Sequence, residues 1–110
     1  MSEIPYREVV KQMGVEMQTD MVAEEVGEIL STLSKFKRGR VSPMDLAGEV
    51  ADVRIMLDQI GHIVEELTAG TVTAENFEVW CDGLRKAKIE RLCGMLGIKF
   101  DADFIEQARP

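Results

Sequence analysis

Hydrophobic positions recur at helical spacing along most of the chain, and no segment shows a convincing strand period. The pattern predicts three long helices, over residues 15–37, 43–67 and 74–96. The stretch "YREVVKQM", residues 6–13, fits a short helix or an arm. The last residues, "FDADFIEQARP", fit a short helix or a tail that docks on a neighbour.

The breaks between these segments carry the residues that commonly start and stop helices. Gly39 is a plausible stop for the first long helix, and Pro43 behind a Ser42 cap is a plausible start for the second. Thr73 is placed to cap the third helix, and Gly97 is placed to end it. These signals predict an all-α, antiparallel bundle of three long helices with short terminal helices.

The size of the chain indicates one domain, residues 1–110. A chain this short buries only a small core, so its apolar helix faces favour self-association over a monomer. We find no internal repeat, low-complexity tract or second domain.

Composition and charge exclude several functions. The net charge of −7 argues against binding a nucleic-acid polymer, which requires clustered Lys and Arg. No apolar run approaches the roughly 18 residues of a membrane span, and no signal-peptide pattern is present. Cys81 and Cys93 form no CxxC pair, and we expect buried or half-buried thiols in a reducing compartment. We therefore expect a cytoplasmic protein without membrane contact.

Four carboxylates break the apolar pattern of the first two long helices. Glu25 and Glu49 fall inside the apolar stripes of their helices. Glu28 and Asp52 follow three residues later, at the edges of the same stripes. Side chains three residues apart project from one face of a helix, so each pair is directed to one side.

Antiparallel packing about the "KRGR" break would bring the two pairs together. Residues equidistant from that break lie level, which sets Glu28 opposite Glu49 and Glu25 opposite Asp52. Four acids would then converge between two helices. Such a cluster is unfavourable unless cations neutralise it, and the adjacent stripe positions offer no Lys or Arg.

Hard oxygen ligands without His or Cys suit Mg²⁺, or alternatively Mn²⁺. Mg²⁺ commonly shares its coordination shell with substrate phosphates, which predicts a metal site for a phosphorylated compound. A di-iron carboxylate bundle would require Glu-x-x-His motifs, and the single histidine, His62, does not follow a glutamate at that spacing. The sequence therefore does not support a di-iron site.

The acidic residues lie in motifs of a known family. "EEVGE" followed by "EVAD" resembles the EExxE and ExxD motifs of the all-α nucleoside triphosphate pyrophosphohydrolases, the MazG-like superfamily that also contains dimeric dUTPases. The likeness to small single-domain MazG-like proteins covers residues 14–96, through the segments "GVEMQTDMVAEEVGEILSTLSKFKRGR", "DLAGEVADVRIMLDQIGHIV" and "KIERL".

The resemblance implies a helical bundle that assembles as a homodimer or homotetramer. It implies Mg²⁺ held by Glu25, Glu28, Glu49 and Asp52. The implied reaction is hydrolysis of a nucleoside triphosphate between its α- and β-phosphates, giving a monophosphate and pyrophosphate. Glu24 matches the first motif glutamate and is a candidate base for the attacking water, although its position on the helical wheel turns it away from the other acids.

Five further substrate-binding positions are expected: Gln18, Lys35, Arg38, Lys88 and Arg91. Gln18 matches a family glutamine and would contact the nucleobase or sugar, or be a polar interface residue. Lys35 and Arg38, which share the inter-helix turn with Lys37 and Arg40, would contact phosphates or form a solvated turn.

The third long helix contributes two of the expected residues. Lys88 and Arg91 match the family's "KIERL" segment, and Lys88 would contact a phosphate or pair with the acidic cluster. Trp80 favours packing or an interface over stacking on a base. The Asn or Asp that some family members carry near the metal site is absent from "LRKAKIERL".

Two alternative functions are kept open. A phosphoribosyl-ATP pyrophosphohydrolase also carries paired acidic motifs, although the helix after its second motif differs from "VRIMLDQI". A non-catalytic helical oligomerisation module would retain the fold with vestigial acids, and here all four acids are present.

Overall fold

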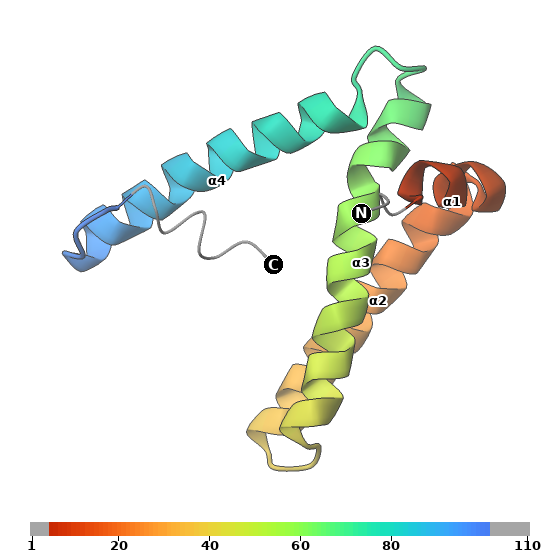
Figure 1. Ribbon diagram of the computed structural model, residues 1–110. Coiled ribbons are helices and arrows are strands. Elements are labelled where there is room, and N and C mark those ends of the chain that lie inside the picture. The colour runs from red at the N-terminus through yellow and green to blue at the C-terminus, as the bar shows by residue number, and fades with distance from the viewer. Residues whose placement is uncertain (1–4, 102–110) are drawn as a thin grey trace. The chain divides into compact units, whose positions relative to one another are not determined.

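The computed structural model describes residues 5–101, and these contain helices and no strand. The elements are α1 (Tyr6–Met13), α2 (Val15–Lys37), α3 (Pro43–Leu67) and α4 (Ala74–Leu96) (Figure 1). The all-α prediction and the boundaries of the three long helices are confirmed, and residues 6–13, predicted as a short helix or an arm, form a helix. The short helix or tail expected at the C-terminus lies outside the described residues from residue 102 onward.

Contacts along the chain group into two units, Met1–Ala74 and Glu75–Pro110. The first unit contains α1, α2 and α3, and the second contains nearly all of α4. Within residues 5–101, no helix combines the length and the apolar character required to cross a membrane.

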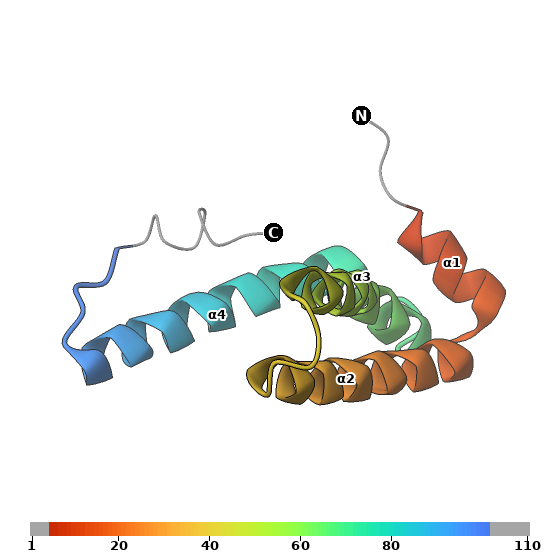
Figure 2. The same cartoon turned by 90° about the horizontal axis from the view of Figure 1, so that it is seen from below.

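Helices α2 and α3 form an antiparallel hairpin, lying side by side in both views (Figures 1 and 2). Gly39 ends α2 with φ +71°, a conformation in which a side chain would be strained. Ser42 and Asp45 then form a capping box at the start of α3. The Asp45 N–H donates to Ser42 Oγ over 3.0 Å, and the Ser42 N–H donates to Asp45 Oδ2 over 2.9 Å. Pro43 occupies the first turn, where its missing N–H has no helical partner to lose.

Ser42→Ala is expected to destabilise the protein by about 1 kcal/mol, since it removes the acceptor for an otherwise unpaired N–H at the start of α3. Urea unfolding followed by circular dichroism measures this change. Ser31→Ala, at an exposed position in the interior of α2, is the matched control and should be neutral or slightly stabilising. Equal stability of the two variants would contradict a role for the cap.

Helix α1 packs against the end of the hairpin that is remote from the turn (Figure 1). Glu65 of α3 holds it there through two hydrogen bonds from Arg7, at 2.9 and 3.2 Å. The same carboxylate accepts the N–H of Ala74 over 3.1 Å, so it also fixes the end of the α3–α4 connection. The centroids of the Tyr6 and His62 rings are 6.3 Å apart.

These contacts to Glu65 make part of the stability depend on pH. The Arg7 hydrogen bonds, then the Ala74 N–H, lower the pKa of Glu65 below its ordinary 4.5. Its contribution is therefore full above pH 4.5 and is lost as pH falls through the lowered folded-state pKa. Glu65→Gln should reduce the free energy of unfolding at pH 7, and the difference from wild type should shrink below pH 4.5. A difference independent of pH would contradict the assignment.

The hydrophobic core of the described residues is small. Its buried members are Val10, Ile63 and Ala74 in the first unit and Cys93 in the second. Cys93 is buried as predicted, but Cys81 is exposed, so the expectation of a buried or half-buried thiol is wrong there. The two thiols are twelve residues apart on α4, about 120° around its axis, so they lie on different sides of the helix and need not share their burial.

Candidate metal centre

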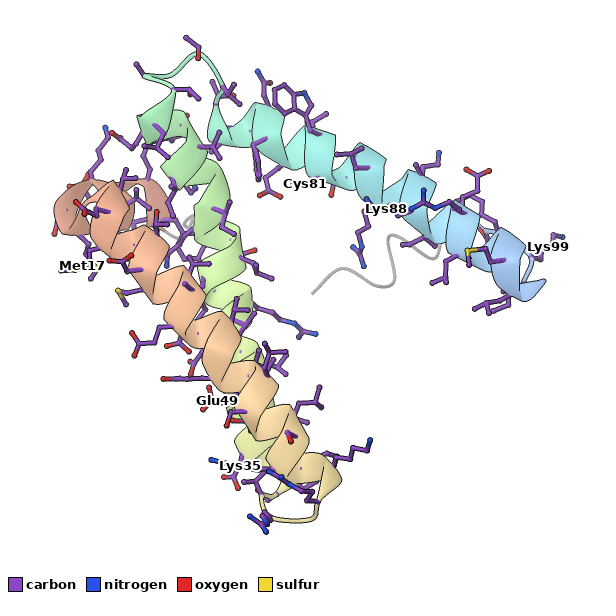
Figure 3. The ribbon with its side chains drawn as sticks, turned by 180° about the vertical axis from the view of Figure 1, so that it is seen from behind. Met17, Lys35, Glu49, Cys81, Lys88 and Lys99 are labelled. Carbon is purple, nitrogen blue, oxygen red and sulfur yellow. The ribbon has the colours of Figure 1, made fainter. Side chains whose placement is uncertain are left out.

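Three carboxylates from the two arms of the hairpin converge. Glu25 of α2 and Glu49 and Asp52 of α3 each offer one oxygen, and these oxygens lie within 4.8 Å of one another. Figure 3 shows Glu49 part-way along the hairpin, between Met17 at one end and Lys35 near the turn. This spacing is compatible with a single cation that contacts all three groups.

Two of these carboxylates have an oxygen without a partner. Glu25 and Glu49 are half-buried, and Oε2 of each is buried without a hydrogen bond. A buried carboxylate oxygen without a donor is unfavourable, because water is lost and nothing replaces it. A proton or a metal ion at these oxygens would remove that cost.

The electrostatics of Glu25 also favour binding of a proton or a metal ion. Burial raises the pKa of its carboxyl above the ordinary value, and the charges of Glu28, Asp52, Glu49 and Glu24 add to the effect in that order. Each of these causes disfavours the ionised form of Glu25. A divalent cation would reverse the balance, because it binds the ionised form and offsets the neighbouring negative charges.

The two remaining acids lie outside the group of three. Glu28 is exposed, and it is the charged neighbour that acts most strongly on Glu25. Its position at the edge of the cluster would allow it to join the coordination shell directly or through water. Glu24 is exposed and is the weakest of the four charges acting on Glu25, consistent with its outward wheel position.

The set of ligands fits a hard cation. All three groups are carboxylates, which suit Mg²⁺ or Mn²⁺ better than a soft metal. Asp52 is exposed, so one side of the cluster faces solvent. Waters and phosphate oxygens could complete an octahedral shell from that side, which is the usual way in which proteins bind Mg²⁺.

The basic residues of the inter-helix turn lie toward one end of this cluster. Lys35 and Arg38 are exposed, ten and thirteen residues beyond Glu25. That separation corresponds to about 15 and 20 Å along a helix axis. At that distance they could contact the outer phosphates of a long ligand more readily than the phosphate that would lie beside the metal.

Lys88 and Arg91 lie on α4, in the second unit, and both are exposed. Lys88 and Cys81 both lie on α4 (Figure 3). They line a shallow apolar groove together with Leu84, Arg85, Ile89 and Leu92. The acidic group belongs to the first unit and this groove, with Lys88 and Arg91, to the second.

Gln18 is almost completely buried, with 1% of its surface exposed, and Gln59 is buried to a similar degree at 3%. The sequence analysis singled out Gln18 but missed Gln59. The two residues are equidistant from the turn, as Glu25 and Asp52 are, so the same hairpin arithmetic would have found Gln59.

Comparison with protein-family models, with curated proteins and with solved structures gave no match for this chain. The function is therefore inferred from the motifs and from the geometry of the carboxylates.

Proposed function

We propose that this chain is a Mg²⁺-dependent nucleoside triphosphate pyrophosphohydrolase of the MazG-like type. One observation carries the proposal: carboxylate oxygens of Glu25, Glu49 and Asp52 converge, and two of these residues also carry a buried oxygen without a partner. The three residues belong to the "EEVGE" and "EVAD" stretches that resemble the family's motifs. Mn²⁺ would fit the same oxygens.

In this proposal Glu25, Glu49 and Asp52 hold the cation, and Glu28 completes or supports its shell. When bound, Mg²⁺ would polarise the phosphate oxygens and lower the pKa of a bound water. Hydrolysis would form a bond from the oxygen of the attacking water to a phosphorus of the α–β anhydride and break the anhydride bond, which would release a monophosphate and pyrophosphate. Glu24, by its motif position, is proposed to accept the proton of that water.

The remaining expected residues would position the substrate. Lys35 and Arg38 would meet the outer phosphate oxygens, where a cationic donor is most favourable. Gln18 would contact the nucleoside. Lys88 and Arg91 are proposed as phosphate contacts on α4.

Self-association is part of the proposal, as a homodimer or homotetramer. The observation that favours it is the apolar surface of α4, where large side chains are widely exposed: Val79, Trp80, Leu84, Leu92, Met95 and Leu96. A single helix with such a surface is marginally stable in water unless another helix covers it.

Two alternatives use the same observations differently. A phosphoribosyl-ATP pyrophosphohydrolase would use the same cation for a related substrate. A non-catalytic oligomerisation module would use the α4 surface alone. The unpartnered oxygens of Glu25 and Glu49 favour a functional site over vestigial acids, because without a ligand they only destabilise the fold.

The test is pyrophosphate release from each common ribo- and deoxyribonucleoside triphosphate, with Mg²⁺ and with EDTA. We expect release with Mg²⁺ and none with EDTA. Mg²⁺ should also raise the melting temperature, since a ligand that binds only the folded state stabilises it by about 2.7 kcal/mol at one hundred times its Kd. Mg²⁺ binding without release would favour phosphoribosyl-ATP or another unusual nucleotide. If Mg²⁺ does not bind, the oligomerisation module becomes the better description.

A further inference from the structure

Two buried amides lie beyond the acidic cluster, toward the end of the hairpin that is remote from the turn. Gln18 of α2 and Gln59 of α3 are level with each other and nearly inaccessible to solvent. The Oε1 atom of each is buried and accepts no hydrogen bond. Two unsatisfied carbonyl oxygens at one level of a hairpin are costly, because a buried acceptor without a donor forfeits the hydrogen bond it had with water.

The amides continue the line of the carboxylates. Gln18 precedes Glu25 by seven residues, and Gln59 follows Asp52 by seven. Seven residues are close to two helical turns, so each glutamine lies on nearly the same face as its acid, about 10 Å away along the axis. The nucleoside of a triphosphate extends from its α-phosphate over a distance of the same order.

Helix α1 covers this end of the hairpin. Met13, its last residue, approaches Gln18, whose Nε2 donates to the Met13 sulfur over 3.0 Å. A thioether is a weak acceptor, so this bond is readily exchanged for a better one. The cover is joined to α2 at Gly14, with φ +88°, and is held to α3 by the Arg7–Glu65 pair, whose side chains are 44% and 16% exposed. Lifting the cover would break this pair and uncover Val10, the buried side chain of α1.

We propose that Gln59 together with Gln18 reads the nucleoside of the substrate, and that α1 is a cover which opens to admit it. With the cover displaced, the two Oε1 atoms accept hydrogen bonds from N–H or O–H groups of the base or sugar while the phosphates lie at the carboxylates. This inference rests on the proposed function, since it assigns the far end of the same site.

The recognition role can be separated from the metal–phosphate site by comparing two ligands in the presence of Mg²⁺. The first is the α,β-methylene analogue of each common nucleoside triphosphate, which resists cleavage. The second is tripolyphosphate, which has the phosphates but no nucleoside. Calorimetric titration of the full chain gives the Kd of each ligand.

Gln59→Leu is expected to weaken the tightest analogue by about 10- to 100-fold and to leave tripolyphosphate binding unchanged, because it removes an acceptor used only by the nucleoside. Gln59→Met is a second variant of similar shape, and both should fold, since a buried unsatisfied amide is replaced by an apolar group. Gln12→Leu, at an exposed position on α1, is the matched control and should change neither Kd.

Four results would overturn the inference. If Gln59→Leu binds the analogue with the wild-type Kd, the two amides do not contact the nucleoside and are only an internal polar pair. Equal weakening of both ligands would indicate a general disturbance of the site. If wild type binds tripolyphosphate as tightly as every analogue, the nucleoside is not read, yet the proposed metal–phosphate site stands. If wild type binds neither ligand, the proposed function fails and this inference fails with it.

A separate measurement tests whether α1 opens during binding. Arg7→Met removes the hydrogen bonds to Glu65, and we expect it to raise the association rate constant of the analogue several-fold in stopped-flow measurements. An unchanged or lower rate constant would contradict opening of α1 as a step in binding.

Discussion

Glu25→Gln is expected to lower pyrophosphate release by more than about 100-fold and to raise the melting temperature of the metal-free protein. The loss of activity follows because Glu25 is a central member of the carboxylate group, and even residues that only support a metal ligand are worth about 10- to 100-fold. The gain in stability follows because burial and four negative neighbours disfavour the Glu25 carboxylate, and a neutral amide escapes that repulsion.

The effect of pH separates this explanation from a general change in packing. The folded state holds the Glu25 proton more tightly than the unfolded chain does, because its pKa is raised from 4.5. In wild type without metal, this carboxyl therefore destabilises the fold progressively as pH rises above 4.5 and through the raised pKa. The advantage of Glu25→Gln should grow over the same interval and reverse in saturating Mg²⁺.

Glu16→Gln, an exposed acid at the start of α2, is the matched control and should keep full activity and Mg²⁺-dependent stabilisation. Asp52→Asn should reproduce the loss of activity, because Asp52 belongs to the same group of three. Full activity in either Glu25→Gln or Asp52→Asn would exclude the carboxylate site.

Replacing Leu84 and Leu92 together by Glu is expected to convert an assembly of the 12.3 kDa chain into a monomer with reduced helical content. Both leucines are more than half exposed and both line the apolar groove of α4. Two charges placed there cannot be buried against another helix without a large desolvation cost. Loss of the partner would then leave α4 with only its intrinsic helix propensity.

Sedimentation equilibrium measures the mass and circular dichroism the helix content. Lys86→Glu is the matched control, since it changes the net charge by the same amount at an exposed position outside the groove lining. It should keep the wild-type mass. A monomeric wild type at micromolar concentration, or an assembly that survives both leucine substitutions, would contradict self-association through α4.

The helix boundaries could be predicted because local chemistry sets them. Ser42, Asp45 and Pro43 form their cap from neighbouring residues, and Gly39 and Gly97 both adopt positive φ as helix-ending glycines do. The convergence of Glu25 with Glu49 and Asp52 could be predicted for a related reason, because one turn fixes the register of two straight helices.

What the sequence could not give depends on contacts between distant residues. Arg7 meets Glu65 across 58 positions, and this pairing requires knowing where α1 docks. The exposure of Glu28 depends on the rotation of α2 about its axis and on its side-chain conformation, which a helical wheel does not resolve. Gln59 was not among the predicted site residues, although the register that sets Glu25 level with Asp52 also sets Gln59 level with Gln18.

The tight turn between α2 and α3 also bears on how the protein folds. Hairpin contacts join segments that are close in sequence, and chains dominated by such contacts fold rapidly, whereas association of subunits is slower and depends on concentration. In the proposed homo-oligomer, the hairpin should therefore form before the subunits associate, and the hairpin alone brings Glu25, Glu49 and Asp52 together. The nascent chain meets its own charge repulsion at that early stage, so dissolved Mg²⁺ should accelerate refolding of the isolated chain.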